Sequence, residues 1–124
     1  MTEARMGQVQ LKIMQLLWKL KRATARELTD ELNKVDAIAH STVQTLLRQL
    51  EAKGSVEHQQ EGRTFYFLPL VQEDKVKKSA ARELVRNVFE GSAGGLVSYL
   101  LQNEKVSAEE LAEIRKLIDK KRKG

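Results

Sequence analysis

The chain has 124 residues, of which 41% are hydrophobic and 31% are charged, a balance typical of one or two small globular domains. It contains no cysteine, which excludes a disulfide framework and a thiolate metal site, and we expect no cofactor. There is no apolar run of the roughly 18 residues that a membrane span requires, and no signal-peptide core, so we expect a cytoplasmic protein without membrane insertion. The net charge of +5 is compatible with nucleic acid but modest, so any DNA binding must depend on where the charges are placed.

Residues 8–20 form the first predicted element. Their apolar positions recur at helical spacing and are Val9, Ile13, Leu16, Leu17 and Leu20. This pattern predicts one amphipathic helix whose stripe begins a core. Trp18 lies inside the pattern, and we interpret it as a core residue rather than as a platform for stacking a base or ligand.

A short second helix is predicted next. Thr24 and Glu27 have the spacing of a capping box, in which each side chain bonds to the backbone of the other residue. The helix should run to about Asn33, with its leucines directed inward. A polar connection over residues 34–39 then leads to a third helix. The second helix, this connection and the third helix together make a helix-turn-helix pattern.

The third predicted helix runs from about Ser41 to Gly54. Ser41 and Gln44 predict a capping box at its start, and Gly54 predicts its end. Its apolar stripe is Val43, Leu46, Leu47 and Leu50. The opposite face has no acidic residue and consists of Ser41, Thr42, Thr45, Arg48 and Gln49. Such a face is either an ordinary solvated surface or one that hydrogen-bonds base edges and phosphates in the major groove of DNA.

After this helix the pattern changes from helical to alternating. Residues 56–59 and 64–68 are rich in strand-forming residues and predict a β-hairpin, in which Gly62 supplies the positive φ of the turn and Pro69 ends the second strand. A helix-turn-helix followed by a hairpin is a winged helix. Arg63 at the hairpin tip is then either a contact to the sugar-phosphate backbone or an exposed turn arginine without a partner.

From residue 72 the pattern is helical again. A stripe over residues 76–89 is followed by a helix break at residues 91–95 and by two further apolar helices, the last opened by a capping box at Ser107. Three helices in about 50 residues make a poor independent core. We therefore expect residues 71–124 to pair with a second copy, the alternative being that they fold back onto residues 1–70. The apolar residues expected at the dimer interface are Leu84, Val85, Val88, Phe89, Leu96, Val97, Leu100, Leu101, Leu111, Ile114, Leu117 and Ile118.

The expected fold class is therefore mainly α with a small β-hairpin. A winged helix-turn-helix DNA-binding domain is expected over residues 1–70, and a C-terminal helical dimerisation arm over residues 71–124. The basic residues 120–124 are interpreted as a frayed, solvated terminus rather than as a DNA contact.

Together these pieces resemble the penicillinase repressors of the BlaI/MecI type, whose copper-responsive relatives are the CopY repressors. The resemblance runs from Leu11 to Ile118 and depends on the order and spacing of the pieces more than on any one of them. The matching residues are Ile13-Met14, Leu17-Trp18, Ser41 to Leu47, Lys53-Gly54, Gly62-Arg63, Phe65, Phe67, Pro69, Phe89, Ser92, Leu96-Val97 and Ser107 to Leu111.

The resemblance implies a homodimeric winged-helix repressor on a palindromic operator, controlling β-lactam-resistance or related stress genes. Ser41, Thr42 and Thr45 would then face bases or nearby phosphates, and Arg63 would be the wing contact. In the β-lactam-responsive members a membrane sensor triggers proteolysis within the dimerisation arm. The cut lies at an Asn-Phe pair, which by spacing corresponds here to Tyr99-Leu100.

Several positions depart from the family pattern. The Tyr99-Leu100 pair differs from the usual scissile pair, and the absence of cysteine excludes the cysteine-based copper sensing of the CopY members. Gln49 stands where an arginine is usual, with Arg48 one step earlier, which rotates the cation by about 100° around the helix. Gln10 stands where a glutamate is common. We expect these changes to alter operator preference or signal more than the fold.

We therefore expect a DNA-binding repressor that acts by occupying an operator as a dimer. The alternative is a winged-helix module that binds protein rather than DNA. An enzyme is not expected, because the neighbours His40 and Ser41 cannot form a nucleophile–base pair through adjacency alone, and a capping role explains Ser41.

Overall fold

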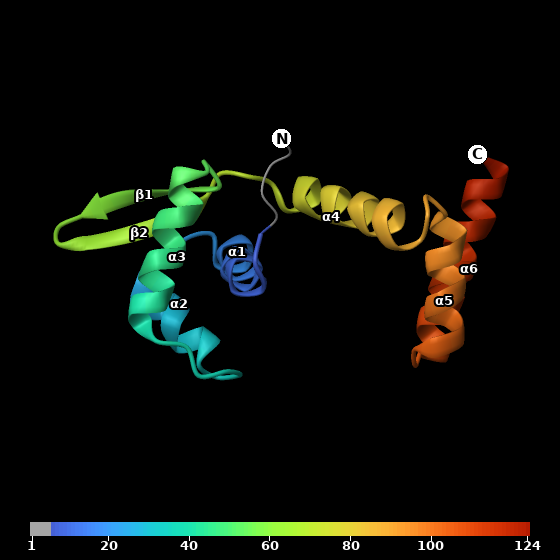
Figure 1. The fold of residues 1–124 in the computed structure, drawn as a ribbon, viewed down its shortest axis with the longest axis horizontal. Helices are drawn as coiled ribbons and strands as arrows, with labels where there is room; N and C mark the ends of the chain where they lie inside the picture. Colours follow the sequence, from blue (N-terminus) through green and yellow to red (C-terminus); the bar gives the residue numbers. More distant parts are fainter. Residues whose placement is uncertain (1–5) are drawn as a thin grey trace. The chain divides into compact units, whose positions relative to one another are not determined.

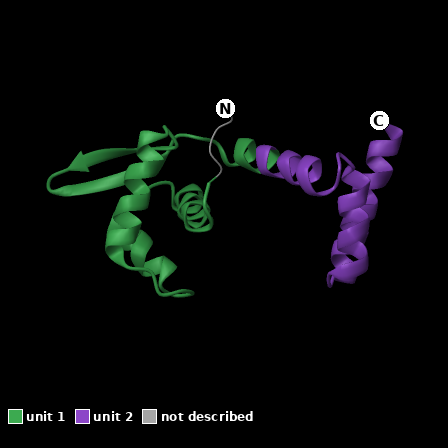
Figure 2. Cartoon of the chain, viewed as in Figure 1, with its two compact units in different colours: residues 1–78 green, residues 79–124 purple. Residues whose placement is uncertain are grey.

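The computed structural model describes residues 6–124, which divide into two compact units with the boundary after Lys78 (Figures 1 and 2). The first unit contains α1 (Gln8–Leu20), α2 (Ala25–Leu32), α3 (His40–Ala52), β1 (Val56–Glu61) and β2 (Thr64–Pro69). Helix α4 (Glu73–Val88) begins in the first unit and ends in the second, which also contains α5 (Ala93–Asn103) and α6 (Ala108–Lys123). The expected fold class, mainly helical with one small antiparallel hairpin, is confirmed.

The core of the first unit lies where its three helices and the hairpin meet. Helix α1 contributes fully buried aliphatic side chains to it, as does the predicted stripe of α3. The buried apolar residues among those the structure describes are Ile13, Met14, Leu17, Ala23, Leu28, Leu32, Val43, Leu47, Leu50 and Val56. Since each large aliphatic side chain contributes about 1.5–3 kcal/mol on full burial, this cluster fixes α3 against α1 and α2. Trp18 packs against the cluster, and its indole Nε1 donates a hydrogen bond to the carbonyl oxygen of Val71 at 3.0 Å.

The starts of α2 and α3 are stabilised in different ways. At α2 the predicted capping box is present: Thr24 Oγ1 accepts from the backbone N of Glu27 at 3.0 Å, and Glu27 Oε1 accepts from the backbone N of Thr24 at 2.8 Å. At α3 the predicted box at Ser41 is wrong. The N-cap is Ala39, two residues earlier than predicted, and it makes no side-chain cap hydrogen bond.

The connection before α3 explains this shift. The side chain of Asn33 donates to the carbonyl oxygen of Ile38 at 2.8 Å and accepts from the backbone N of Ile38 at 3.1 Å. These two bonds fix the chain immediately before the helix. The carbonyl oxygen of Ala39 then accepts hydrogen bonds from the backbone N atoms of Thr42 and Val43. As a result Ser41 lies within the first turn, exposed, and its hydroxyl is not used as a cap.

The hairpin is a regular antiparallel pair in which Glu61 lies opposite Thr64. The two turn residues are Gly62, with φ +63°, and Arg63, whose φ is not positive, and this is the pattern of a type II′ turn. A third segment adds to β2: Ala23 and Phe67 exchange two backbone hydrogen bonds, of 3.1 Å and 2.8 Å. The hairpin is therefore attached to the loop between α1 and α2 rather than only to the end of α3.

The second unit has well-formed helices but no core of its own. None of the residues of α4, α5 or α6 is buried. After α4, Glu90 and Gly91 both have positive φ. Ser92 then caps α5 by accepting from the backbone N of Gly95 at 2.8 Å, so Gly94 and Gly95 belong to the first turn of α5 rather than to the predicted break.

Helix α6 begins at the predicted cap, where Ser107 Oγ accepts from the backbone N of Glu110 at 3.0 Å. It continues to Lys123, so the expectation of a frayed end from residue 120 is wrong. The basic side chains of this last turn lie at the helix C-terminus, where the helix dipole favours positive charge. Within residues 6–124, none of the helices combines the length and apolar character needed to cross a membrane.

Candidate nucleic-acid interface

The exposed face of α3 carries hydrogen-bonding groups and a cation. Ser41, Thr42, Thr45 and Arg48 are all exposed, on the side of the helix opposite its buried stripe. Arg48 Nη2 donates to Thr45 Oγ1 at 3.2 Å. The guanidinium therefore lies over the middle of this face, one helical turn from the Cα atom of Arg48. An arginine at position 48 rather than 49 thus still places its charge on this face.

Gln49 lies on the edge of the same face, and its side chain contacts α1. Gln10 Nε2 donates to Gln49 Oε1 at 3.0 Å, and Gln10 is itself buried. The carbonyl oxygen of Gln10 accepts from the backbone N of Gly7 at 3.2 Å and from Lys53 Nζ at 3.5 Å. Gln10 and Gln49 thus contact each other. Their separation of 39 residues hides this pairing from any local pattern in the sequence.

The carboxylate of Glu51, at the end of α3, is directed to the hairpin. It pairs with His58 Nδ1 at 2.7 Å. The ring of His58 in turn lies with its centroid 5.1 Å from that of Phe65 and 5.8 Å from that of Phe67. The Glu51 carboxylate is therefore bonded to the hairpin, and the exposed face of α3 carries no carboxylate.

The hairpin tip presents Arg63, which is exposed and has no ion-pair partner among residues 6–124. The neighbouring carboxylate of Glu61 accepts from Arg22 Nη1 at 2.7 Å, and Arg22 Cζ lies 4.0 Å from the centroid of the Tyr66 ring. The hydrogen bond to Glu61 raises the pKa of Arg22 further above its ordinary value. Arg22 could not be identified from the sequence, because no local pattern links it to Glu61, which lies 39 residues further along the chain.

His40 and Ser41 do not form a catalytic arrangement. His40 Nδ1 lies 2.9 Å from Thr29 Oγ1, and that hydroxyl donates to the carbonyl oxygen of Ala25 at 2.8 Å. Because the hydroxyl proton is committed, Thr29 must accept from the histidine, which holds the ring against α2. In the part of the chain that the structure describes, no three His, Asp or Glu side chains are grouped closely enough to hold a metal ion.

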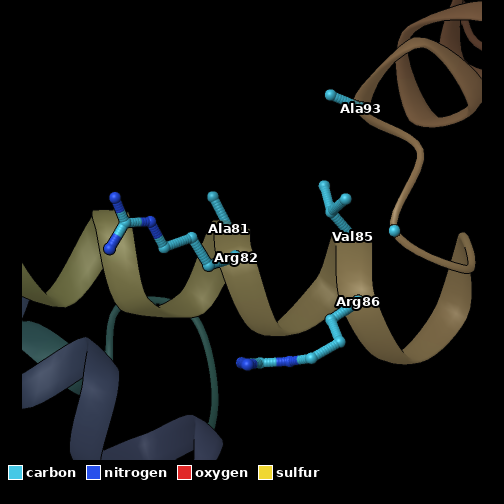
Figure 3. A pocket seen from close by; sticks show the side chains of 6 residues that line it. Ala81, Arg82, Val85, Arg86 and Ala93 are labelled. Carbon is cyan, nitrogen blue, oxygen red and sulfur yellow. The ribbon is translucent and has the colours of Figure 1, made fainter.

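The residues predicted at a dimer interface lie on α4, α5 and α6, apart from Phe89, which follows α4, and all are exposed or half-buried in the single chain. The most exposed are Leu117, at 66%, and Val88, at 63%. An open hollow of about 420 Å³ lies beside α4. Among its lining residues, Ala81 and Val85 point to the side on which Ala93 lies (Figure 3). Val85, one of the residues predicted at the interface, lines this hollow.

The Tyr99-Leu100 pair lies in the middle of α5. Both side chains are exposed, and the Tyr99 ring lies 5.8 Å from the ring of Phe89. The carbonyl oxygen of Tyr99 accepts from Asn103 Nδ2 at 2.9 Å. The bond between the two residues is thus within a regular helix, and a protease that requires an extended substrate would first have to unwind it.

Comparison with known proteins gives one family. The family model described as penicillinase repressor matches residues 6–120. The penicillinase repressor of Bacillus licheniformis is 27% identical over 110 residues, covering 89% of this chain and 86% of that protein. The methicillin resistance regulatory protein MecI of Staphylococcus aureus strain N315 is 26% identical, covering 89% of each chain.

Two solved structures resemble part of the chain. The solution structure of the DNA-binding domain of the repressor BlaI has 31% identity and a TM-score of 0.52, and covers 59% of this chain and 90% of that domain. The solution structure of the monomeric form of Bacillus licheniformis BlaI in complex with the blaP half-operator has 30% identity and a TM-score of 0.51. It covers 59% of this chain and 89% of the other.

Proposed function

This chain belongs to the penicillinase repressor family, and from that premise we propose that it is a transcriptional repressor that binds a palindromic DNA operator as a homodimer. The observation that carries the proposal is the exposed, carboxylate-free face of α3, together with a hairpin tip whose arginine has no ion-pair partner among residues 6–124. A similar domain has been solved in complex with a half-operator, which supports DNA as the partner. The proposal places the protein in the cytoplasm, together with the DNA it regulates.

The proposed mechanism is occupancy of the operator rather than chemistry. Helix α3 would lie in the major groove, with Ser41, Thr42, Thr45 and Arg48 near base edges and phosphates. Arg63 would contact the sugar-phosphate backbone from the hairpin. Phosphate contacts supply affinity that falls with salt, whereas base contacts supply the choice of sequence. Gln49 would contribute less to base recognition than its neighbours, since its oxygen is bonded to Gln10.

Dimerisation through the second unit completes the proposal. The interface would include the twelve apolar residues predicted for it on α4, α5 and α6 and at Phe89, none of which is buried in the single chain. Exposed apolar surface of this extent in a small protein is typical of an interface. Two copies of α3 would then read half-sites about one turn of DNA apart, or a multiple of one turn.

Release from DNA would follow cleavage in the arm. The proposed bond is Tyr99–Leu100, and a membrane sensor protease is the proposed partner. A cut there would disconnect α6 from α4 and so divide the dimer interface. Mass spectrometry of the protein recovered from cells challenged with a β-lactam should show two fragments that meet at this bond. An intact chain recovered free of its operator would contradict this route of release.

A mobility-shift titration tests the proposed function. The DNA upstream of the protein's own gene and a scrambled duplex of equal length are titrated at several salt concentrations. Thr45→Ala should reduce the preference for the operator by about 1–3 kcal/mol, as one lost base contact does. The matched control is Ser79→Ala, which deletes an exposed hydroxyl from α4 and should change neither duplex. An equal loss on both duplexes for Thr45→Ala would contradict its assignment to base recognition.

The same titration separates DNA binding from the alternative, a module that binds protein. Arg63→Ala should weaken the operator and the scrambled duplex alike, and should reduce the slope of log K against log salt by about one. A wild-type protein that shifts neither duplex at moderate salt would favour the protein-binding alternative.

A further inference from the structure

The hairpin tip combines a cation with an anion in a way that DNA binding should not tolerate. Glu61 is the last residue of β1 and immediately precedes the turn residues Gly62 and Arg63. A bare carboxylate at this place would face the phosphate backbone and oppose the contact that Arg63 makes. In the structure this carboxylate is paired with Arg22.

Arg22 holds the Glu61 carboxylate from the loop between α1 and α2. Its Nη1 atom donates to Glu61 Oε2 at 2.7 Å, and its Cζ atom lies 4.0 Å from the centroid of the Tyr66 ring. The ring stack fixes the plane of the guanidinium, while the ion pair fixes its direction. The next residue, Ala23, pairs with Phe67 through the backbone, so the arginine is anchored beside the strand it contacts.

The remaining charges near this pair are few. Glu27, on α2, is a weaker electrostatic neighbour of Arg22. The other carboxylate that pairs with the hairpin, Glu51, is bonded to His58. Glu61 is therefore the acidic group nearest to the hairpin turn in sequence, and Arg22 is its ion-pair partner among the described residues.

We propose that Arg22 is a positioning residue for the DNA-binding hairpin, which acts by neutralising Glu61 and holding it away from the phosphate backbone rather than by contacting DNA itself. This inference rests on the proposed DNA binding. The two side chains together contribute no net charge, so Arg63 remains the effective charge at the tip. The role is specific to this pair, because it requires both the ion pair and the stack on Tyr66.

A double-mutant cycle tests the proposal on the full-length protein. Affinities for the operator and for the scrambled duplex are measured at about 0.1 M salt for the wild type, Arg22→Ala, Glu61→Gln and the double variant. Arg22→Ala should weaken binding to both duplexes by about five- to tenfold, because it leaves the Glu61 carboxylate unpaired close to phosphate. Glu61→Gln alone should change affinity less than twofold. In the double variant, binding should return to within about twofold of the wild type.

The matched control is Arg26→Ala, which also removes an exposed arginine from the first unit. In that background Glu61→Gln should have the same small effect as in the wild type. A larger gain there would show that only total charge matters, and would overturn the proposal. A double variant as weak as Arg22→Ala would also overturn it, since the arginine would then bind DNA directly or merely hold the hairpin together. A wild-type protein that binds neither duplex would instead refute the proposed function, and this inference with it.

Discussion

The two units of this chain use similar apolar residues with different results. The first unit buries ten apolar side chains between α1, α2, α3 and the hairpin. The second unit has apolar stripes of the same periodicity on α4, α5 and α6, yet buries none of them. The contrast teaches that an amphipathic pattern predicts which face of a helix is to be covered, but does not say which chain covers it.

The largest expected effect is a cavity in the first unit. Leu47 is fully buried on α3, so Leu47→Ala should reduce the free energy of unfolding by about 2–5 kcal/mol. The measurement is urea denaturation of the full chain at several protein concentrations. Since the side chain belongs to a core within one chain, the loss should be the same at each concentration. A loss that vanished at high protein concentration would show that the core of the first unit, like the arm, depends on a second chain.

The second prediction concerns the arm. Leu117 is 66% exposed on α6, and Leu117→Asp should raise the dimer dissociation constant by about 100-fold or more, because a carboxylate would be buried at the interface. Sedimentation velocity measures this directly. Lys120→Asp, a charge change on the same helix at a polar position, is the control and should have a much smaller effect. Equal effects of the two substitutions on the dissociation constant would show that Leu117 does not lie at the interface.

The third prediction compares two helix caps of the same kind. Thr24 caps α2 in the first unit and Ser107 caps α6 in the arm, each through a bond of 3.0 Å to a backbone amide. Each substitution by alanine should cost about 1 kcal/mol. For Thr24→Ala the cost should appear in thermal unfolding at any protein concentration, whereas for Ser107→Ala it should appear as weaker dimerisation. An effect of Ser107→Ala that did not depend on concentration would show that the arm folds without a partner.

The smallest effect is expected at the edge of the DNA-binding face. Gln49→Ala removes the hydrogen bond to Gln10 and should lower the free energy of unfolding by about 1 kcal/mol or less. Because the side chain is bonded to α1, operator preference should fall less than for Thr45→Ala. Mobility-shift titrations of the two variants side by side measure this difference. A larger loss for Gln49→Ala would make this glutamine a principal base contact.

Much of the fold could be predicted from the sequence, because its signals are local. The apolar spacing of residues 8–20 gave the bounds of α1 without error, and Gly62 marked the hairpin turn correctly. Signals that compete locally were less reliable. Ser41 had the pattern of a cap, but bonds between Asn33 and Ile38 start the helix earlier. The predicted break over residues 91–95 is present but ends earlier, because Ser92 caps α5 and Gly94 and Gly95 belong to that helix.

The candidate site was predicted in part. Periodicity alone was enough to place Ser41, Thr42, Thr45 and Arg48 on one exposed face, since burial of one side of a helix exposes the other. Which of these residues contact DNA remains part of the proposal. The supporting contacts of Arg22 with Glu61, and of Gln10 with Gln49, could not be predicted, because each joins residues 39 positions apart. Such pairs depend on the tertiary fold rather than on any local spacing.

The central claim is that the arm is completed by a second copy and so presents two α3 helices to DNA. Sedimentation equilibrium of the full-length protein at low micromolar concentration tests it most directly. If the arm dimerises, the protein should sediment as a species of twice the 14.1 kDa mass of one chain. A single species of 14.1 kDa, with the protein folded and its arm intact, would contradict it.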